Sequence, residues 1–224
     1  MAKHQFNLRR FLRNALLIII LVGGGIFAWE ELLEDRLIAK NFATVEDGRL
    51  YRAGALSPAA LRRVAESNDI KTIIDFGGYD KDPETFEAIR KVDAELGLRR
   101  IQLPLNGDAT GDPNMYVEAL RLLRDESNYP VLTHCAAGSE RTGMCVLLHR
   151  VLEEDWSVEQ AYRETRSYGH NPDDNWRFMM YFGTWRDEIE HALETGEPIP
   201  FVPGAGPQTR PETDVAPASP PTEG

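Results

Sequence analysis

One segment of this sequence combines a cysteine, an arginine and two glycines at a spacing that suits phosphate chemistry. It reads His134-Cys135-Ala136-Ala137-Gly138-Ser139-Glu140-Arg141-Thr142-Gly143. A short β-prone stretch, residues 131–133, precedes it, and a helical pattern follows from about Arg141. A loop between a strand and a helix N-terminus presents unpaired backbone N–H groups, and the helix dipole adds about half a positive charge. The pattern therefore predicts an anion site.

Several residues of this loop have a specific chemical use. Gly138 and Gly143 allow a tight turn and a close approach of the backbone to a phosphate. Arg141 presents a planar fork of donors that can hold two phosphoryl oxygens at once. The same positive field favours the thiolate form of Cys135, which is the reactive form. A thiolate beneath a bound phosphoryl group is placed for in-line attack.

The order His-Cys, five residues, then Arg-Thr-Gly resembles the signature of the cysteine-dependent protein tyrosine phosphatases. Tyr51-Arg52-Ala53-Gly54 and Pro130-Val131 are similar to segments of the compact dual-specificity branch found in bacteria. The resemblance covers roughly residues 42–190. It implies a phosphatase that hydrolyses phosphomonoesters through a phosphocysteine intermediate, with no metal and no other cofactor.

The resemblance also implies a role for each residue of the loop. Cys135 would be the nucleophile, and Arg141 would bind the phosphate and the transition state. Thr142 would assist breakdown of the intermediate, and His134 would orient the loop. Beside Arg141, the phosphate-binding positions would be Ala136, Ala137, Gly138, Ser139 and Glu140.

The family also needs a general acid upstream of the cysteine, and two aspartates follow Leu105. Asp112 precedes Pro113 and is typical of a helix N-cap, which would tie its carboxylate to backbone N–H groups. Asp108 has no such role in the pattern and lies in a glycine-containing stretch suited to a mobile lid. We therefore expect Asp108 to be the acid, with Asp112 as the alternative.

Two departures from the family pattern bear on the substrate. The first parallel strand ends in Asp75-Phe76-Gly77-Gly78, where many bacterial relatives have an arginine. The variable loop positions include no lysine, whereas relatives acting on polyphosphoinositides or inositol pyrophosphates carry basic residues there. Glu140 would repel additional phosphates. We therefore expect a phosphoprotein, with phosphotyrosine foremost, or a small aryl phosphate as substrate.

Two other functions fit the same loop. A non-catalytic phosphate-binding module would need only the cradle, but Cys135, Arg141 and Asp108 are all present. A rhodanese-like sulfur-transfer enzyme also places a cysteine in such a loop, but the Arg141-Thr142-Gly143 ending and the upstream acid favour the phosphatase.

The remaining cysteine and histidines have simpler interpretations. Cys145 is expected to pack inside the helix after the loop, with a reversible disulfide to Cys135 as the alternative. His149, His170 and His191 lack metal-ligand spacing with one another and are predicted to be surface or packing residues.

Strand and helix patterns alternate through the middle of the chain. This predicts an α/β domain with a central, mainly parallel sheet flanked by helices. A hairpin is expected around Asp47-Gly48, and strands over residues 72–76, 101–105 and 131–133. Helices are expected from cap signals at Ser57-Pro58, Asp82-Pro83, Asp112-Pro113 and Ser157 with Gln160, and over residues 141–154 and 174–194. The aromatic residues of the last helix are expected in the core.

The length of 224 residues suits one domain with tails, and the net charge of −11 argues against general nucleic-acid binding. Residues 30–202 form the predicted phosphatase domain, and the Pro-rich residues 203–224 a predicted disordered tail. The sequence leaves the oligomeric state open.

The N-terminal part has the pattern of an export or membrane segment. Residues 1–14 are basic, residues 15–29 are uncharged and mostly apolar, and acidic residues follow directly. This order predicts a single-pass anchor with a cytoplasmic N-terminus and an extracytoplasmic catalytic domain. The alternative is a signal peptide whose cleavage releases a secreted or periplasmic protein.

Overall fold

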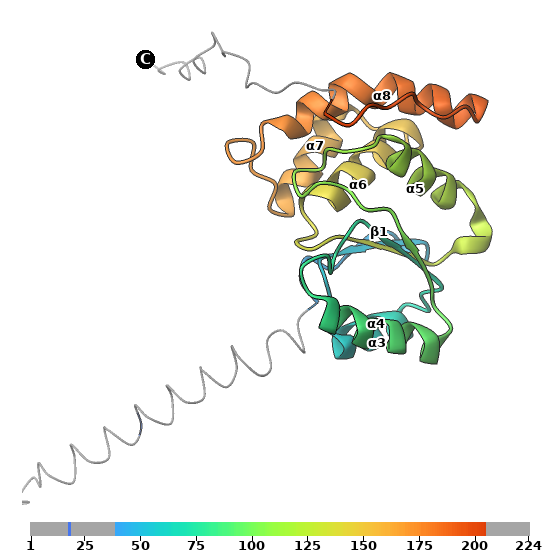
Figure 1. The fold of residues 1–224 in the computed structure, drawn as a ribbon, viewed down its shortest axis with the longest axis vertical. Helices are drawn as coiled ribbons and strands as arrows, with labels where there is room; N and C mark the ends of the chain where they lie inside the picture. Colours follow the sequence, from blue (N-terminus) through green and yellow to red (C-terminus); the bar gives the residue numbers. More distant parts are fainter. Residues whose placement is uncertain (1–17, 19–38, 205–224) are drawn as a thin grey trace, which may run out of the picture. The chain divides into compact units, whose positions relative to one another are not determined.

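The computed structural model describes residue 18 and residues 39–204 of the chain (Figure 1). The predicted basic flank, the apolar segment apart from Ile18, and the tail beyond residue 204 lie outside the described residues. Within the described part, no helix is long and apolar enough to cross a bilayer. The described residues divide into two compact units. We call residues 39–102 with 125–138 the sheet unit, and residues 103–124 with 139–204 the helical unit.

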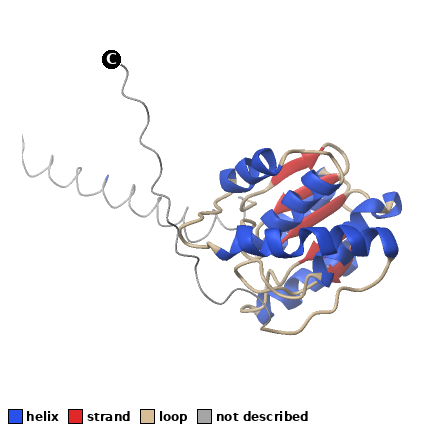
Figure 2. Ribbon diagram, turned by 90° about the horizontal axis from the view of Figure 1, so that it is seen from above, coloured by secondary structure: helices blue, strands red, loops and turns tan. Residues whose placement is uncertain are grey.

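The sheet unit holds a five-stranded sheet with the order β1-β2-β5-β3-β4. Its strands, side by side in Figure 2, are β1 (Ala43–Glu46), β2 (Leu50–Ala53), β3 (Thr72–Asp75), β4 (Arg99–Gln102) and β5 (Val131–His134). The β1–β2 pair is antiparallel and the other three pairs are parallel, so the predicted mainly parallel sheet is confirmed. Because β5 is the middle strand, the loop that follows it leaves the sheet at the edge where α/β proteins bind ligands.

Two helices of the sheet unit begin at the predicted cap-plus-proline signals. They are α3 (Pro58–Ser67) and α4 (Pro83–Leu96). The side chains of Ser57 and Asp82 each accept a hydrogen bond from the first helical turn, which satisfies an N–H that the helix leaves unpaired. Gly97 ends α4 in the left-handed conformation at φ 67°, and a short 3₁₀ turn, Glu126–Asn128, precedes β5.

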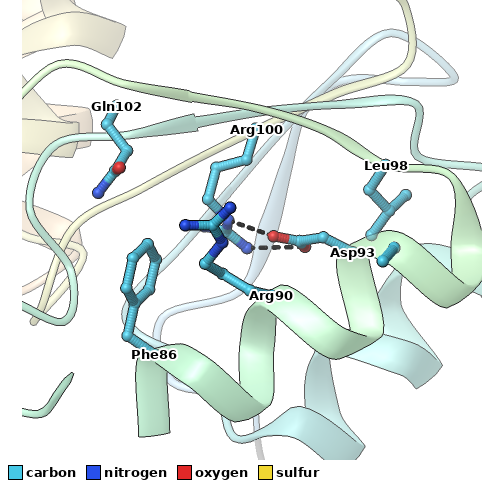
Figure 3. A pocket seen from close by; sticks show the side chains of 7 residues that line it. Phe86, Arg90, Asp93, Leu98, Arg100 and Gln102 are labelled. Carbon is cyan, nitrogen blue, oxygen red and sulfur yellow. Dashed lines mark hydrogen bonds and ion pairs between the residues drawn. The ribbon is translucent and has the colours of Figure 1, made fainter. Parts of the chain in front are cut away.

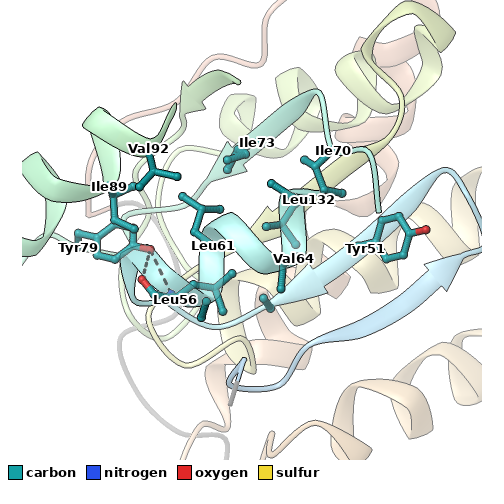
Figure 4. Close-up of a cluster of buried hydrophobic side chains, with 13 residues drawn as sticks. Tyr51, Leu56, Leu61, Val64, Ile70, Ile73, Tyr79, Ile89, Val92 and Leu132 are labelled. Carbon is teal, nitrogen blue, oxygen red and sulfur yellow. Dashed lines mark hydrogen bonds between the residues drawn. The ribbon is translucent and has the colours of Figure 1, made fainter. Parts of the chain in front are cut away.

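The core of the sheet unit lies where α3 and α4 pack on one face of the sheet (Figure 4). Its members include Tyr51, Leu61, Val64, Ile73, Ile89, Val92 and Leu132. Side chains alternate across a strand, so β2 directs Tyr51 and Ala53 to this face and Leu50 and Arg52 to the other. Arg52 is thereby buried on the face that α3 and α4 do not cover.

The helical unit contains α5 (Asn114–Arg124), α6 (Glu140–Leu152), α7 (Val158–Ser167) and α8 (Arg177–Thr195). The predicted capping box is present at the start of α7, where Ser157 and Gln160 exchange hydrogen bonds. In α8, the aromatic residues Phe178, Tyr181 and Phe182 are buried, as predicted for core residues, whereas Trp185 is only half-buried.

The predicted boundaries differ from the observed ones where long-range contacts set them. The second parallel strand, expected over residues 101–105, is β4 at residues 99–102, because its register follows β3. The last helix, expected from residue 174, begins at Arg177, because residues 171–175 form a separate turn in which the Asn175 N–H donates to the Asn171 carbonyl.

Candidate active site

Cys135 directly follows β5 and is 1% exposed. Its Sγ accepts a hydrogen bond from the N–H of Gly138 at 3.2 Å. One backbone N–H of the loop is thus directed at the sulfur atom. Cys135 and Cys145 are both buried and are not joined by a disulfide, so the disulfide considered from the sequence is not formed and Cys145 packs inside the protein as predicted.

Three consecutive carbonyl oxygens after Cys135 accept hydrogen bonds from residues 41–55 of the sheet unit. The pairs are Ala55 N to Ala136 O at 3.0 Å, Asn41 Nδ2 to Ala137 O at 2.8 Å, and Arg52 Nη2 to Gly138 O at 2.7 Å. In a planar trans peptide the N–H points opposite to the C=O. The N–H groups of this loop are therefore directed away from those donors, and that of Gly138 reaches the sulfur.

Two glycines allow the loop backbone to approach β2 this closely. Gly138 has a φ of 78°, and a Cβ there would lie 2.7 Å from Gly54 N. A Cβ on Gly54 would lie 2.9 Å from the carbonyl oxygen of Ala137. Such distances are too short for any side chain, so the geometry of the loop requires glycine at both positions.

The side chain of His134, one residue before Cys135, is fixed by buried charges. Arg100 Nη1 lies 2.8 Å from His134 Nε2 and 3.1 Å from Asp75 Oδ2. Arginine can only donate, so Nε2 accepts and the imidazole is neutral. Burial lowers the pKa of His134, and this outweighs the nearby Asp75 carboxylate, which raises it. A neutral, fixed imidazole fits the orienting role that the resemblance implies.

Arg100 is held in place by a second carboxylate. Its guanidinium forms two hydrogen bonds to Asp93 of α4, at 2.7 and 3.1 Å (Figure 3). The side chain is 7% exposed and lines a cavity of about 330 Å³ together with Phe86, Arg90, Asp93, Ala94, Leu98 and Gln102. With Asp75 and Asp93 both paired to it, Arg100 acts as a structural group that holds His134.

The second half of the motif begins the helical unit, at the N-terminus of α6. Glu140 is the first residue of α6, and the preceding Ser139 makes no side-chain cap. Arg141 is 8% exposed and Thr142 is fully buried. A helix start that lacks a side-chain cap suits an anion, because the ligand can accept the hydrogen bonds that a cap would otherwise accept.

Asp108 is held more firmly than the sequence predicts. Its Oδ1 accepts hydrogen bonds from the N–H and the hydroxyl of Thr110, at 3.2 and 2.7 Å, and its Oδ2 lies 3.4 Å from Arg177 Nη1. The expectation that this carboxylate has no local backbone role is therefore wrong, since Asp forms such turns readily. The next residue, Ala109, is fully buried at φ 69°, and its carbonyl accepts from Tyr116 Oη. The stretch expected to be a mobile lid is an ordered turn.

Asp112, the alternative acid, caps the start of α5 as predicted. Its Oδ1 accepts from the N–H and the side-chain amide of Asn114, at 2.9 and 2.8 Å. Asp108 and Asp112 thus both accept a backbone hydrogen bond, and the bond to Asp112 is the shorter. Both aspartates accept these bonds through Oδ1, and Asp108 Oδ2 lies near Arg177.

A family model described as the tyrosine phosphatase family matches residues 37–194, well over half of the chain. This chain belongs to the tyrosine phosphatase family.

The chain is 28% identical over 156 residues to the dual specificity protein phosphatase TpbA of Pseudomonas aeruginosa, covering 67% of this chain and 66% of TpbA. It is 29% identical over 133 residues to the inositol diphosphatase DSP4 of Arabidopsis thaliana, covering 57% and 63% of the two chains. The chain thus spans just under two thirds of these relatives. The crystal structure of P. aeruginosa TpbA has the same fold, with a TM-score of 0.56 at 23% identity over 69% of this chain and 91% of that one.

The predicted site residues are distributed over both units. Cys135 and the loop as far as Gly138 belong to the sheet unit, whereas Arg141, Thr142 and Asp108 belong to the helical unit. Within the helical unit, Asn175 joins Glu140 of the loop to the backbone of Asp108.

Sequence reasoning missed several residues that position the phosphatase loop. Asn41 and Arg52 donate to loop carbonyls from about 90 positions away, and His170, predicted to be a surface or packing residue, hydrogen-bonds Glu140. The signal available for Arg52 was its place in the Tyr51-Arg52-Ala53-Gly54 segment that resembles the family.

Proposed function

We propose that this chain is a phosphatase that hydrolyses phosphomonoesters, phosphotyrosine in proteins foremost, through a phosphocysteine on Cys135. The observation that carries the proposal is the loop after Cys135. Its carbonyls are fixed by outside donors, and the N–H of Gly138 is directed at Sγ. Backbone N–H groups fixed in advance stabilise anionic transition states without reorganisation.

The reaction takes two displacements at phosphorus. In the first, the Cys135 thiolate forms a P–S bond, the ester P–O bond breaks, and Asp108 gives its proton to the leaving oxygen. In the second, water attacks the phosphocysteine, the P–S bond breaks, and the Asp108 carboxylate takes a proton from that water. Arg141 holds two phosphoryl oxygens throughout, and the Thr142 hydroxyl assists the departure of the thiolate.

The charges near the loop favour a single phosphate group. Ala136, Ala137 and Ser139 bring no positive charge, and Glu140 brings a negative one. Inositol pyrophosphates carry several additional phosphates that this carboxylate would repel. Because relatives include an inositol diphosphatase, such a compound is the competing substrate that the assay must include.

The test is hydrolysis of p-nitrophenyl phosphate, a phosphotyrosine peptide and an inositol pyrophosphate by the full-length chain, with a chelator present. We expect turnover of the first two that vanadate blocks, no turnover by Cys135→Ser, and a loss of about 100-fold or more in Asp108→Asn. Cys145→Ser, the other buried thiol, is the matched control and should retain activity. Full activity of Cys135→Ser would rule out the phosphocysteine mechanism.

We also propose that residues 15–29 anchor the chain in a membrane, with the catalytic domain outside the cytoplasm. The apolar run between basic and acidic flanks supports this. Resistance of the membrane-bound chain to alkaline extraction tests the anchor, and its release as a shortened soluble chain would instead indicate signal cleavage.

A further inference from the structure

Glu140, the first residue of α6, directs its carboxylate at two donors of the helical unit. His170 Nδ1 lies 2.9 and 3.1 Å from the two carboxylate oxygens, and Asn175 Nδ2 lies 2.5 Å from Oε2. A carboxylate only accepts, so both nitrogens carry the hydrogens. The His170 side chain is fully buried, with Tyr162 Oη 3.1 Å from its Nε2. The carboxylate of this loop residue therefore has a fixed position.

Asn175 also contacts the turn that carries Asp108. Its Nδ2 lies 2.9 Å from the backbone carbonyl oxygen of Asp108, in addition to the bond to Glu140. An amide nitrogen has two hydrogens, and here each has one acceptor. Both partners are acceptors, so the orientation of the amide is determined by the network. The side chain is 9% exposed, and water therefore competes little for these bonds.

We propose that Asn175 is a positioning residue, whose amide fixes the turn that carries Asp108 relative to the first turn of α6. Two phosphatase elements 32 positions apart, Asp108 and Glu140, are joined through this one amide. The inference rests on the proposed function, in which Asp108 is the general acid. Asn175 acts on the reaction through the placement of Asp108 and does not itself touch the substrate.

This role has a signature that a purely structural role lacks. A general acid matters most when the leaving oxygen is strongly basic and least when it is a good leaving group. Misplacing Asp108 should therefore impair hydrolysis of phenyl phosphate strongly and that of 2,4-dinitrophenyl phosphate little. Loss of folded protein, or damage to phosphate binding, would lower both rates by the same factor.

The experiment measures kcat/KM of the full-length chain on aryl phosphates whose leaving phenols range from phenol to 2,4-dinitrophenol. For Asn175→Ala we expect about a 10-fold loss on phenyl phosphate and less than about 3-fold on the dinitrophenyl ester. Asn171→Ala is the matched control, because this exposed side chain in the same turn forms hydrogen bonds to Asp173 and Asp174 and not to Asp108 or Glu140 within the described part of the chain. It should retain the wild-type dependence on the leaving group.

A double-variant cycle decides whether Asn175 acts through Asp108. In the Asp108→Asn background, Asn175→Ala should lower kcat/KM by less than about 2-fold further, because the general acid is already lost. An equal loss on all esters, unchanged activity, or full additivity would overturn the inference. If Asn175→Ala does not fold, Asn175→Leu has a similar size, lacks both hydrogens, adds no charge and should give the same pattern. If Asp108→Asn leaves the leaving-group dependence unchanged, the general-acid assignment itself fails.

Discussion

Cys135 of the sheet unit and Asp108 of the helical unit are both held by hydrogen bonds, but the contacts around them differ in kind. Around Cys135 the acceptors are backbone carbonyls of the loop itself, Arg52 is fully buried, and two glycines exclude any Cβ. Around Asp108 the donors belong to Thr110, Asn175 and Arg177, and the side chains of Asp108 and Arg177 are 29% and 43% exposed.

This difference matches the roles that we propose for the two groups, Cys135 as nucleophile and Asp108 as proton donor. A nucleophile needs one position relative to phosphorus, and small displacements of reacting atoms cost large factors in rate. A proton donor must also exchange protons with water between its two steps, so some exposure of Asp108 is useful. We therefore expect single substitutions around Cys135 to lower kcat/KM by large factors. Single substitutions around Asp108 should lower it by smaller factors that depend on the contact removed.

The largest effect on activity is expected for Gly138→Ala, which tests how strictly the loop around Cys135 depends on its geometry. The added Cβ would lie 2.7–2.8 Å from backbone atoms of Ala53 and Gly54, which cannot move without shifting β2. We expect kcat/KM on p-nitrophenyl phosphate to fall by about 1,000-fold, because the loop must leave the geometry that stabilises the transition state.

Gly97→Ala separates this steric effect from backbone strain. Gly97 has a similar φ of 67° but no atom within 4 Å of a Cβ. It should cost about 1 kcal/mol in the free energy of unfolding and leave kcat/KM unchanged. Similar kinetic losses in the two variants would show that the close approach to β2 is not what the loop requires.

The next largest effect is expected for Arg52→Met. The methionine fills much of the same space but removes the donor to the Gly138 carbonyl, and an unsatisfied buried acceptor costs about 1–3 kcal/mol. If this free energy is lost from the stability of the loop conformation that reacts, kcat/KM drops by roughly 10–100-fold.

Arg99→Met is the matched control, since Arg99 is an exposed arginine of the same unit that bonds the side chain of Asn128. Unfolding by urea should show a change within about 0.5 kcal/mol for this variant, with unaltered turnover. Normal turnover of Arg52→Met would mean that the other donors fix the loop without Arg52.

The sequence predicts the parts of this protein that depend on neighbours along the chain. Ser57, Asp82 and Ser157 cap helices through bonds spanning three residues, and all three caps are present. The strand before Cys135 and the helix after Gly138 were likewise predictable, because the β-prone residues 131–133 end at the motif and helix-forming residues follow it.

The residues that sequence reasoning missed act over long distances. Arg52 reaches Gly138 across 86 positions, and Asn175 reaches Asp108 across 67. No local pattern distinguishes such an arginine or asparagine from a solvated one. The role of Asp108 was wrongly predicted for a different reason. Its partner Thr110 is only two residues away, but the glycines on either side indicated a mobile stretch and not a turn.

The smallest effect is expected for Arg177→Gln. This variant tests whether the loss of one contact in the turn that carries Asp108 lowers kcat/KM only slightly. Arg177 lies 3.4 Å from Asp108 Oδ2, but both side chains are partly exposed, so solvent weakens the pair. Removing the Arg177 side-chain charge leaves the bonds of the turn to Thr110 and Asn175 in place, so kcat/KM should change by less than about 2-fold. Arg186→Gln removes the same charge further along α8, where the partners are Asp187 and Glu190, and is the matched control, for which kcat/KM should be unchanged. A loss of 100-fold in Arg177→Gln would mean that the acid turn is as intolerant of change as the loop around Cys135, and the contrast between the two regions would fail.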